Sequence, residues 1–308
     1  MTQLDDIPGE PPQETPPGAA VATPEHERAA ERAASRRGVL LALPAFVYLA
    51  AFFLVPLGVV VVYSFAVRNR FGEAELRDWN LDAYRKLADP VVREIAVRSV
   101  LLAAITTGIG LLIAYPFAWF LSAQRPAVRT VMLVFVMIPF WSNFLVRNYS
   151  WRVLLGTDGP AARASELLGF DGTRILFTPT AVVIGLVYGF LPFMILPLYA
   201  SIERVDAGLL EASRDLYGSA WQTFRHVLLP LSMPGVVAGS ILVFVPSLGA
   251  YVTPEILGGA KTTLLGSYIV TQFGTARNWP VGAALSIVLM VVMVFATLLY
   301  FRRGARNL

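Results

Sequence analysis

Few residues of this sequence have the types and the spacing that catalysis requires. The two histidines, His26 and His226, are far apart in the sequence, and no HExxH motif or clustered set of metal ligands occurs. Serine, histidine and aspartate show no spacing typical of a catalytic nucleophile. The segment EILGGAKTT resembles a phosphate-binding loop, but Glu255 and Ala260 stand where that loop requires glycine. The sequence therefore predicts a protein that is not an enzyme and that binds no metal and no nucleotide itself.

One charged stretch stands between two apolar segments, and it reads EASRDLYGSAWQTFRHVLLP over residues 211–230. Upstream of it, Asp206 is of a type that caps helix starts, and apolar residues over 209–220 recur near 3.6-residue spacing. Gly218 offers a break before a second short helix that runs toward Val227. A short, partly amphipathic helix of this kind is the form expected of an element that docks another protein.

The composition places this stretch in a membrane protein. The chain has 308 residues, of which 56% are hydrophobic and only 15% charged, and its mean hydropathy is +0.61. Soluble domains carry roughly 25% charged residues, and a helix needs about 20 apolar residues to cross the hydrocarbon core. The uncharged runs predict an all-α integral membrane protein with six transmembrane helices. These spans lie at about 39–66, 99–123, 130–149, 177–201, 231–253 and 280–301.

The residue types within the predicted spans limit the classes of function that the chain can have. None of the 21 acidic residues lies in a predicted span, which argues against an ion-coupled secondary carrier. No acidic or histidine cluster lies at lipid depth, which argues against a membrane-embedded enzyme, while a non-transporting scaffold stays open on composition alone. One further uncharged run, 262–276, is too short and too polar to span and is expected to form an external or re-entrant element.

The tail and the termini set the expected organisation. Residues 1–38 include the run PGEPPQETPPG and no apolar core, which predicts a disordered cytoplasmic tail ahead of a six-span domain over 39–308. Arginines next to the first and last spans favour cytoplasmic termini, although the total of Lys and Arg is shared almost evenly between the two sides. The chain has no cysteine, so disulfides are excluded.

The charged stretch resembles the EAA loop in permease subunits of bacterial ATP-binding cassette (ABC) importers. The matching residues are Glu211, Ala212, Val227, Leu229 and Pro230. In that family the loop enters a groove of the ATPase subunit and transmits its closure to the membrane helices. The resemblance implies a type I ABC importer permease fold with a cytoplasmic coupling helix between spans four and five.

The chain departs from the usual loop motif at three positions. Ser213 replaces an alanine and Val227 replaces an isoleucine, and both changes are mild. Tyr217 stands at the usual glycine position, with Gly218 one residue later, so the flexible point is expected to move by one residue. The residues assigned to ATPase docking are Glu211, Ala212, Ser213, Asp215, Tyr217, Gly218, Val227, Leu229 and Pro230.

Other stretches resemble the spermidine/putrescine permease branch of these importers. They are IPFWSNFLVRNYSWRVLLGTDG (138–159), GLVYGFLPFMILPLYASIERVD (185–206), LGAYVTPEILGGAKT (248–262) and GTARNWPVGAALS (274–286). The resemblance covers most of 39–308 and implies that the chain translocates polyamines across the bacterial inner membrane. Import of another small amine or an opine is the alternative.

The resemblance also implies a set of partners. Two copies of an ABC ATPase bind and hydrolyse ATP with Mg²⁺, so no cofactor is expected on this chain. A second permease, expected to be a different chain, completes the path, and a periplasmic substrate-binding protein delivers the substrate. No nucleic acid is implied.

Aromatic and polar residues near the ends of spans three to six are candidates for the substrate path. Aromatic faces attract ammonium groups by about 0.5–2 kcal/mol, although Trp and Tyr also anchor helices at membrane interfaces in any membrane protein. Arg147 would repel a cation and is expected to extend to the interface instead. Prolines in spans three to five mark where these helices open, so these spans are expected to line the path. The candidates are Trp141, Asn143, Tyr149, Trp151, Tyr188, Tyr251, Glu255 and Trp279.

Overall fold

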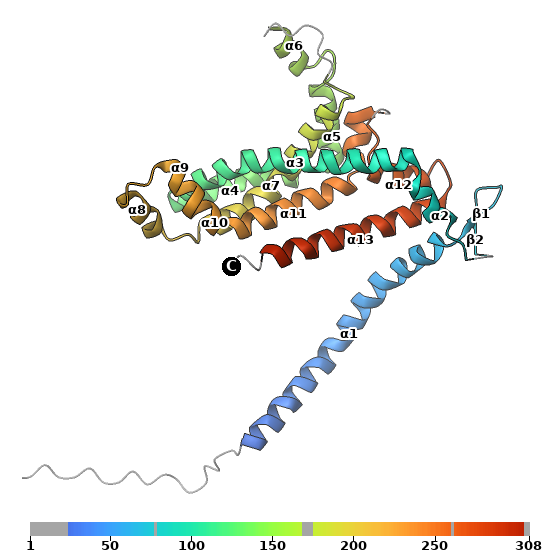
Figure 1. The fold of residues 1–308 in the computed structure, drawn as a ribbon, viewed down its shortest axis with the longest axis horizontal. Coiled ribbons are helices and arrows are strands. Elements are labelled where there is room, and N and C mark those ends of the chain that lie inside the picture. Colours follow the sequence, from blue (N-terminus) through green and yellow to red (C-terminus); the bar gives the residue numbers. More distant parts are fainter. Residues whose placement is uncertain (1–23, 77–78, 168–174, 260–261, 305–308) are drawn as a thin grey trace, which may run out of the picture. The chain divides into compact units, whose positions relative to one another are not determined.

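The computed structural model describes residues 24–76, 79–167, 175–259 and 262–304. These residues form helices joined by loops, with one short antiparallel pair of strands (Figure 1). The chain divides into two units, Met1–Gly58 and Val59–Leu308. The first unit contains most of helix α1 (Pro24–Ser64), and the second contains the other elements.

Four long helices and a series of short ones follow α1. The long helices are α3 (Pro90–Ser122), α7 (Pro179–Ile202), α11 (Met233–Gly249) and α13 (Trp279–Gly304). The strands β1 (Val67–Arg68) and β2 (Ala74–Glu75) pair with Val67 opposite Glu75. The short helices are α2 (Asp82–Arg85), α4 (Pro126–Trp141), α5 (Phe144–Leu154), α6 (Pro160–Leu167), α8 (Ala207–Asp215), α9 (Ala220–Thr223), α10 (Leu229–Leu231) and α12 (Leu265–Phe273). A 3₁₀ turn η1 (Lys86–Ala88) and two π-helical turns, η2 (Phe224–Leu228) and η3 (Pro254–Gly258), complete the elements.

Several of these helices are suited to cross a membrane. Ala42–Ser64 of α1, all of α3 and α7, and Trp279–Leu298 of α13 are long and apolar enough. Two further candidates are bent pairs: α4 with α5, bent by 90°, and Ala220–Leu231 with α11, bent by 68°. The described residues thus hold four spans, or six if each bent pair is one span, and the all-helical membrane fold is confirmed.

The bend between α4 and α5 corrects the prediction of one continuous helix over 130–149. Helix α4 ends at Trp141, and Ser142 has an extended backbone with ψ of 150°. Asn143 then caps α5, because its side-chain oxygen accepts hydrogen bonds from two backbone N–H groups at the start of that helix. Pro139 in the last turn of α4 further weakens the helix there.

Helix α1 begins at Pro24, inside the segment 1–38 for which the sequence predicts disorder. The run RAAERAASRR over 28–37 explains this start, because alanine, glutamate and arginine are strong helix formers. The predicted tail is therefore helical from residue 24 onward. Residues 1–23 lie outside the described residues.

Helices α3, α7 and α11 lie side by side at the centre of the second unit (Figure 1). Leu121 of α3, Met194 of α7 and Val243 of α11 are buried in one apolar cluster, the central cluster. A Cβ at Gly235 of α11 would lie 2.6 Å from the Pro197 carbonyl oxygen of α7, and a Cβ at Gly239 would lie 2.8 Å from the sulfur of Met194 on α7. These glycines therefore let the two helix backbones approach closely, as small residues do between membrane helices.

A second packed region surrounds α12, which lies in the run expected to be external or re-entrant. Helix α12 has nine residues, or about 14 Å of rise, which is too short to span a bilayer. Its first amide, at Leu265, donates a 2.8 Å hydrogen bond to the buried hydroxyl of Ser99 on α3. Gly266 packs so tightly on the end of α11 that a Cβ would collide with the carbonyl oxygen of Gly249. The predicted fifth span, 231–253, accordingly ends at Gly249.

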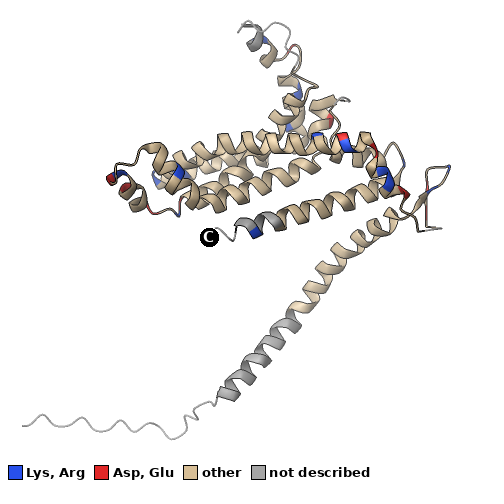
Figure 2. Cartoon of the chain, in the orientation of Figure 1, with Lys and Arg blue, Asp and Glu red and all other residues tan. Residues whose placement is uncertain are grey.

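Charged side chains in the second unit gather near the ends of its long helices and on the short elements that join them. Figure 2 shows them at the α8 end, at the end that carries α2 and the strands, and on α5, while the middle of α3, α7, α11 and α13 carries none. Such a charge-free middle section matches the hydrocarbon core of a bilayer.

Candidate functional site

The docking loop, residues 206–230, forms two short helices at the places that the sequence predicts. Asp206 caps α8 by accepting a 2.9 Å hydrogen bond from the backbone N–H of Gly208. Ser219 caps α9 in a reciprocal capping box with Gln222, in which each side chain bonds the other residue's backbone N–H. Local capping chemistry therefore fixes where both helices begin.

The turn between α8 and α9 closes at Tyr217. The Tyr217 N–H donates to the carbonyl of Arg214 (2.9 Å) and the Gly218 N–H to that of Ser213 (3.0 Å), which is the pattern of a Schellman motif. Tyr217 has φ of 59°, the left-handed conformation that favours glycine. The expectation that the flexible point moves to Gly218 is therefore wrong, because the left-handed residue stays at the position where the importer motif has glycine. Gly218 is required for space instead, since a Cβ there would lie 2.6 Å from the Ser213 carbonyl oxygen.

The outer surface of the docking loop is apolar and open. Leu216, Tyr217 and Trp221 are 82%, 98% and 64% exposed. Leu216 and Tyr217 border a groove of about 500 Å³ between α8 and the segment 222–227. Glu211, Ala212, Asp215 and Pro230 are exposed, and Val227 is half-buried. Large exposed apolar side chains gathered on one element mark a surface that meets a partner.

The inner face of the docking loop packs against the central cluster. The hydroxyls of Ser213 and Thr223 lie 2.9 Å apart and join α8 to α9. Leu228 is buried in the central cluster, and Leu229 and Phe224 pack against it. The Phe224 ring stacks on Trp119 near the end of α3, with centroids 6.3 Å apart. A force applied to the loop therefore reaches α3, α7 and α11 through packed side chains.

One ion pair next to the docking loop was missed by sequence reasoning. Arg129 of α4 meets Glu203, the residue after α7, at 2.7 Å, and its guanidinium also lies 5.8 Å from the Tyr199 ring centroid. The pair joins two helices that are remote in sequence. No spacing rule connects such residues, so only the packing of α4 on α7 reveals the contact.

Two of the predicted path residues, Trp151 and Tyr188, meet. Their rings contact edge to face with centroids 5.3 Å apart. The guanidinium of Arg147 lies 6.0 Å from the Tyr188 ring centroid and donates a 2.9 Å hydrogen bond to the carbonyl of Pro139. The Arg147 side chain is partly buried and lies against Tyr188, and its extension to the membrane interface stays a prediction.

The other predicted path residues lie in three different settings. Trp141 and Tyr149 are exposed, and Asn143 serves as the cap of α5. Glu255 is the second residue of η3 and Tyr251 lies three residues before η3 begins, and η3 packs against both α5 and α7. Trp279 belongs to another aromatic group, with ring centroids 5.8 Å from Tyr63 and 5.6 Å from Phe273.

The bent spans, the close packing of α7 and α11 and the exposed apolar loop are features of a polytopic membrane protein. Over residues 38–304 the chain matches the family model described as the binding-protein-dependent transport system inner membrane component. The chain belongs to this family. It is the multi-pass inner membrane permease of an ABC importer, not the ATPase subunit, and such a permease works with an ATPase and a periplasmic binding protein.

Individual relatives are similar over most of the chain. The spermidine/putrescine transport system permease protein PotB of Escherichia coli K12 is 42% identical over 257 residues, covering 83% of this chain and 93% of that protein. PotB of Haemophilus influenzae is 41% identical over 261 residues, covering 83% and 90%. The inner membrane ABC transporter permease protein YdcU of E. coli K12 is 32% identical over 235 residues, covering 72% and 75%.

The fold is similar to that of solved importers. A chain of the bacterial alginate ABC transporter, crystallised with an alginate pentasaccharide-bound periplasmic protein, superposes with a TM-score of 0.68. The superposition covers 89% of this chain and 96% of that one at 15% identity. At this identity the likeness establishes the fold alone.

Proposed function

We propose that this chain forms half of the translocation path of an ATP-driven importer of polyamines such as spermidine and putrescine. The observation that carries the proposal is the 42% identity to PotB, which extends across 83% of this chain and 93% of the relative. The stretches over 138–159, 185–206, 248–262 and 274–286, which resemble the spermidine/putrescine permease branch, contain the predicted path residues.

In the proposed topology six spans place both termini in the cytoplasm. Helices α4 and α5 then form span three and α11 forms span five, and the docking loop lies on the cytoplasmic side between α7, which is span four, and α11. Helix α8 is the coupling helix in this arrangement. The exposed apolar residues Leu216 and Tyr217, which directly follow this helix, support this role, because a soluble ATPase groove would cover them.

The proposed mechanism follows from the links of this loop. Two ATPase subunits bind ATP and close, and α8 moves with the groove that holds it. The Ser213–Thr223 hydroxyl pair carries the motion to α9, and Phe224 and Leu228 carry it into the central cluster. The spans then switch from inward-open to outward-open, because the closed ATPases bind the loop in only one of these arrangements.

A second permease, different from this chain, completes the path in this proposal. Trp141 and Tyr149 are exposed and have no covering element among the described residues. A partner permease and lipid would cover these surfaces.

One observation favours the alternative substrate class, an opine or another amine that carries a carboxylate. Arg147 lies on Tyr188 without an ion pair to any residue that the structure describes. A guanidinium on the path repels an ammonium group but binds a carboxylate in a fork geometry. An amino acid derivative would place its carboxylate there and its ammonium group on the remaining aromatic faces.

Uptake of radiolabelled putrescine and spermidine tests the proposal. Cells carry this chain with its partner subunits, and unlabelled amino acid derivatives are added as competitors. Saturable uptake of either amine, lost in Glu211→Ala and kept in the control Glu73→Ala on the strand hairpin, is the expected result. If neither amine is taken up while the carboxylate-bearing compounds are, the alternative class replaces the polyamines.

A further inference from the structure

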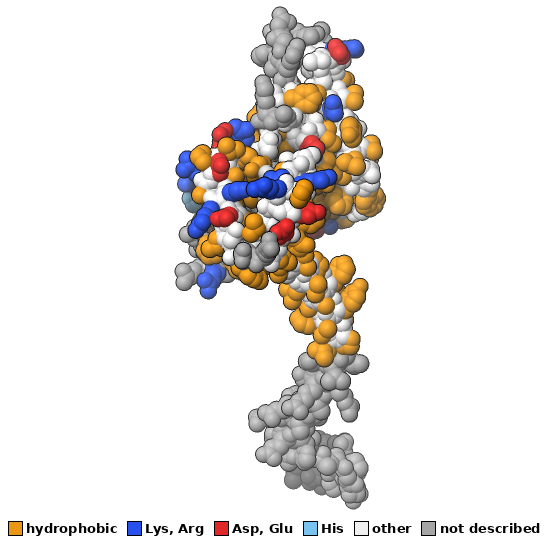
Figure 3. Space-filling view, turned by 90° about the vertical axis from the view of Figure 1, so that its right-hand side faces the viewer, with side chains coloured by type: hydrophobic (Ala, Val, Ile, Leu, Met, Phe, Trp, Pro, Cys, Tyr) orange, Lys and Arg blue, Asp and Glu red, His pale blue; other side chains and the backbone are white. Residues whose placement is uncertain are grey.

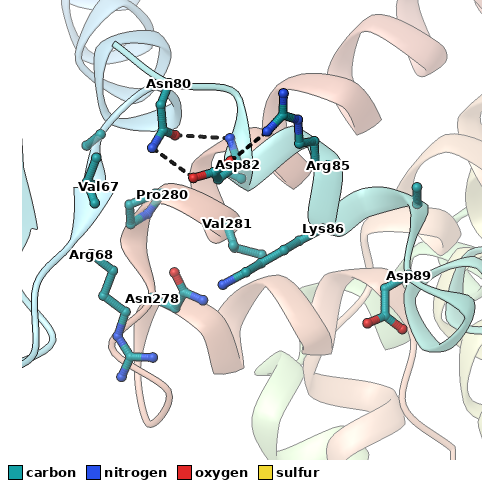
Figure 4. Close-up of a pocket in the computed structure, with 13 residues that line it drawn as sticks. Val67, Arg68, Asn80, Asp82, Arg85, Lys86, Asp89, Asn278, Pro280 and Val281 are labelled. Atoms are coloured by element: carbon teal, nitrogen blue, oxygen red, sulfur yellow. Dashed lines mark hydrogen bonds and ion pairs between the residues drawn. The ribbon is translucent and has the colours of Figure 1, made fainter. Parts of the chain in front are cut away.

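A polar pocket of about 690 Å³ opens at the end of the second unit that carries α2 and the strands. Its walls come from β1, α2, η1 and the start of α13 (Figure 4). Lys86 extends toward Asn278 from one wall, and Arg68 lies on the other side of that amide (Figure 4). Sequence reasoning did not single out any of these three residues.

The acidic side chains of this pocket are already engaged within the chain. Asp82 accepts hydrogen bonds from Arg85 (3.2 Å) and Asn80 (3.1 Å). Asp89 caps α3 by accepting a 2.8 Å hydrogen bond from the Val91 N–H. Their negative charge is therefore partly offset by local donors.

The remaining cations of the pocket have no such partners. Arg68 and Lys86 form no ion pair with any residue in the described part of the chain. With Asp82 and Asp89 held by their own donors, the free charge of the pocket is positive. Asn278 adds an amide N–H₂ donor between the two cations. This arrangement suits a carboxylate, which accepts several hydrogen bonds at once.

The pocket and the docking loop lie at opposite ends of α3. Asp89 caps the N-terminal end of this helix, whereas Trp119 near its C-terminal end stacks on Phe224 of the loop. Helix α3 has 33 residues, or about 50 Å of rise, which exceeds the roughly 30 Å of the hydrocarbon core. The pocket therefore lies across the membrane from the loop. Figure 3 shows that charged side chains of both signs gather on this end of the molecule.

We propose that the pocket formed by Arg68, Lys86 and Asn278 receives an acidic side chain of the periplasmic binding protein. This inference rests on the proposed topology, in which the docking loop faces the cytoplasm. The positive charge of the pocket indicates that its occupant is a carboxylate. The position of the pocket across the membrane from the docking loop indicates that the occupant comes from the periplasm. A single carboxylate seated between the two cations would fix the rotation of the binding protein on the permease.

The test measures ATP hydrolysis by the assembled transporter in lipid nanodiscs as purified, putrescine-loaded binding protein is added. Lys86→Glu and Arg68→Glu are expected to raise the half-maximal concentration of binding protein about tenfold, with the basal and maximal rates unchanged. The matched control is Arg70→Glu, which makes the same charge change on the neighbouring hairpin outside the pocket. Added salt should weaken the wild type more than the double variant. If the Glu variants fail to assemble, Lys86→Gln and Arg68→Gln are tested instead, and a smaller rise in the half-maximal concentration of binding protein is expected for them.

The outcomes separate this inference from the proposed function. A wild-type complex that does not respond to its binding protein at all overturns the proposed topology. A normal wild-type response with the same half-maximal concentration in the pocket variants overturns the pocket proposal alone. Variants that change only the dependence of the rate on the fraction of anionic lipid would assign the pocket to a lipid headgroup, and this also overturns it.

Discussion

The guanidinium of Arg147 on α5 bonds the carbonyl oxygen of Pro139 on α4 at 2.9 Å, across the break between the two helices. The break leaves carbonyl groups at the end of α4 without donors from a following turn, and an unpaired carbonyl within a membrane is costly. The hydroxyl of Ser142 supplies a second donor at 2.6 Å. The positive charge of Arg147 also lies at the negative end of α4, which stabilises it further.

Arg147→Gln should destabilise the transporter by about 2 kcal/mol, because a hydrogen bond from a charged donor is lost. A lower midpoint of thermal denaturation of the purified complex would show this. Arg147→Lys should recover part of the loss, since an ammonium group still reaches the carbonyl but cannot also cover the Tyr188 ring. The control is Arg152→Gln on the same helix, whose guanidinium lies over the Phe177 ring. Equal midpoints for Arg147→Gln and this control would contradict the assignment.

Tyr217→Gly should relieve about 1 kcal/mol of backbone strain, because glycine adopts positive φ without a Cβ penalty. Tyr217→Ala removes the same ring but keeps the strain, so the comparison of these two variants isolates the backbone effect. Hydrogen exchange of the amides over 213–218 is the measurement, and slower exchange in the glycine variant is expected. Both variants should reduce uptake if the exposed ring contacts the ATPase.

Ser213 and Thr223 should be energetically coupled through their hydroxyl pair. The single variants Ser213→Ala and Thr223→Val and the double variant form a thermodynamic cycle. A coupling energy of about 0.5–1.5 kcal/mol is expected from thermal denaturation of the complex. In transport, the three variants should show similar losses of maximal uptake rate, since each one breaks the same link. Strictly additive effects would show that α8 and α9 act independently.

Gly266→Ala should destabilise the complex by about 1–3 kcal/mol, because the added methyl group would collide with the carbonyls of Gly249 and Ala250. The matched control is Gly108→Ala in α3, where a Cβ meets no atom within 4 Å and helix propensity favours alanine. The two variants are compared by their expression levels and by their midpoints of thermal denaturation in detergent. A Gly266 variant as stable as the Gly108 variant would show that α12 can move away from α11.

Features that depend on local sequence were predictable. The caps at Asp206 and Ser219 and the short helices of the docking loop follow from neighbouring residues, and the long apolar runs give the spans. The break at Ser142 was missed because the apolar run continues through it, although Pro139 and Asn143 are each a recognisable signal.

Features that depend on packing were not predictable. Tyr217 adopts a positive φ, a backbone conformation that tyrosine disfavours and glycine favours. Nothing in the sequence indicated this, because Gly218 is the next residue and is the expected place for such a conformation. The placement of Arg147 on Tyr188 and the Arg129–Glu203 pair each require two helices to meet. The pocket at Lys86 combines residues 66–89 with residues 278–281, and these two segments are far apart in the sequence.

The hydrogen bond between Ser99 and the Leu265 amide joins residues 166 positions apart, and it constrains how the chain is made. At about 5–20 residues per second, the ribosome delivers Leu265 on the order of ten seconds after Ser99. Helix α3 is made long before α12, so during synthesis the Ser99 hydroxyl cannot yet accept the hydrogen bond from the Leu265 amide. The packing of α12 against α3 is therefore among the last steps of biogenesis, and a chain released before this region is made lacks this contact.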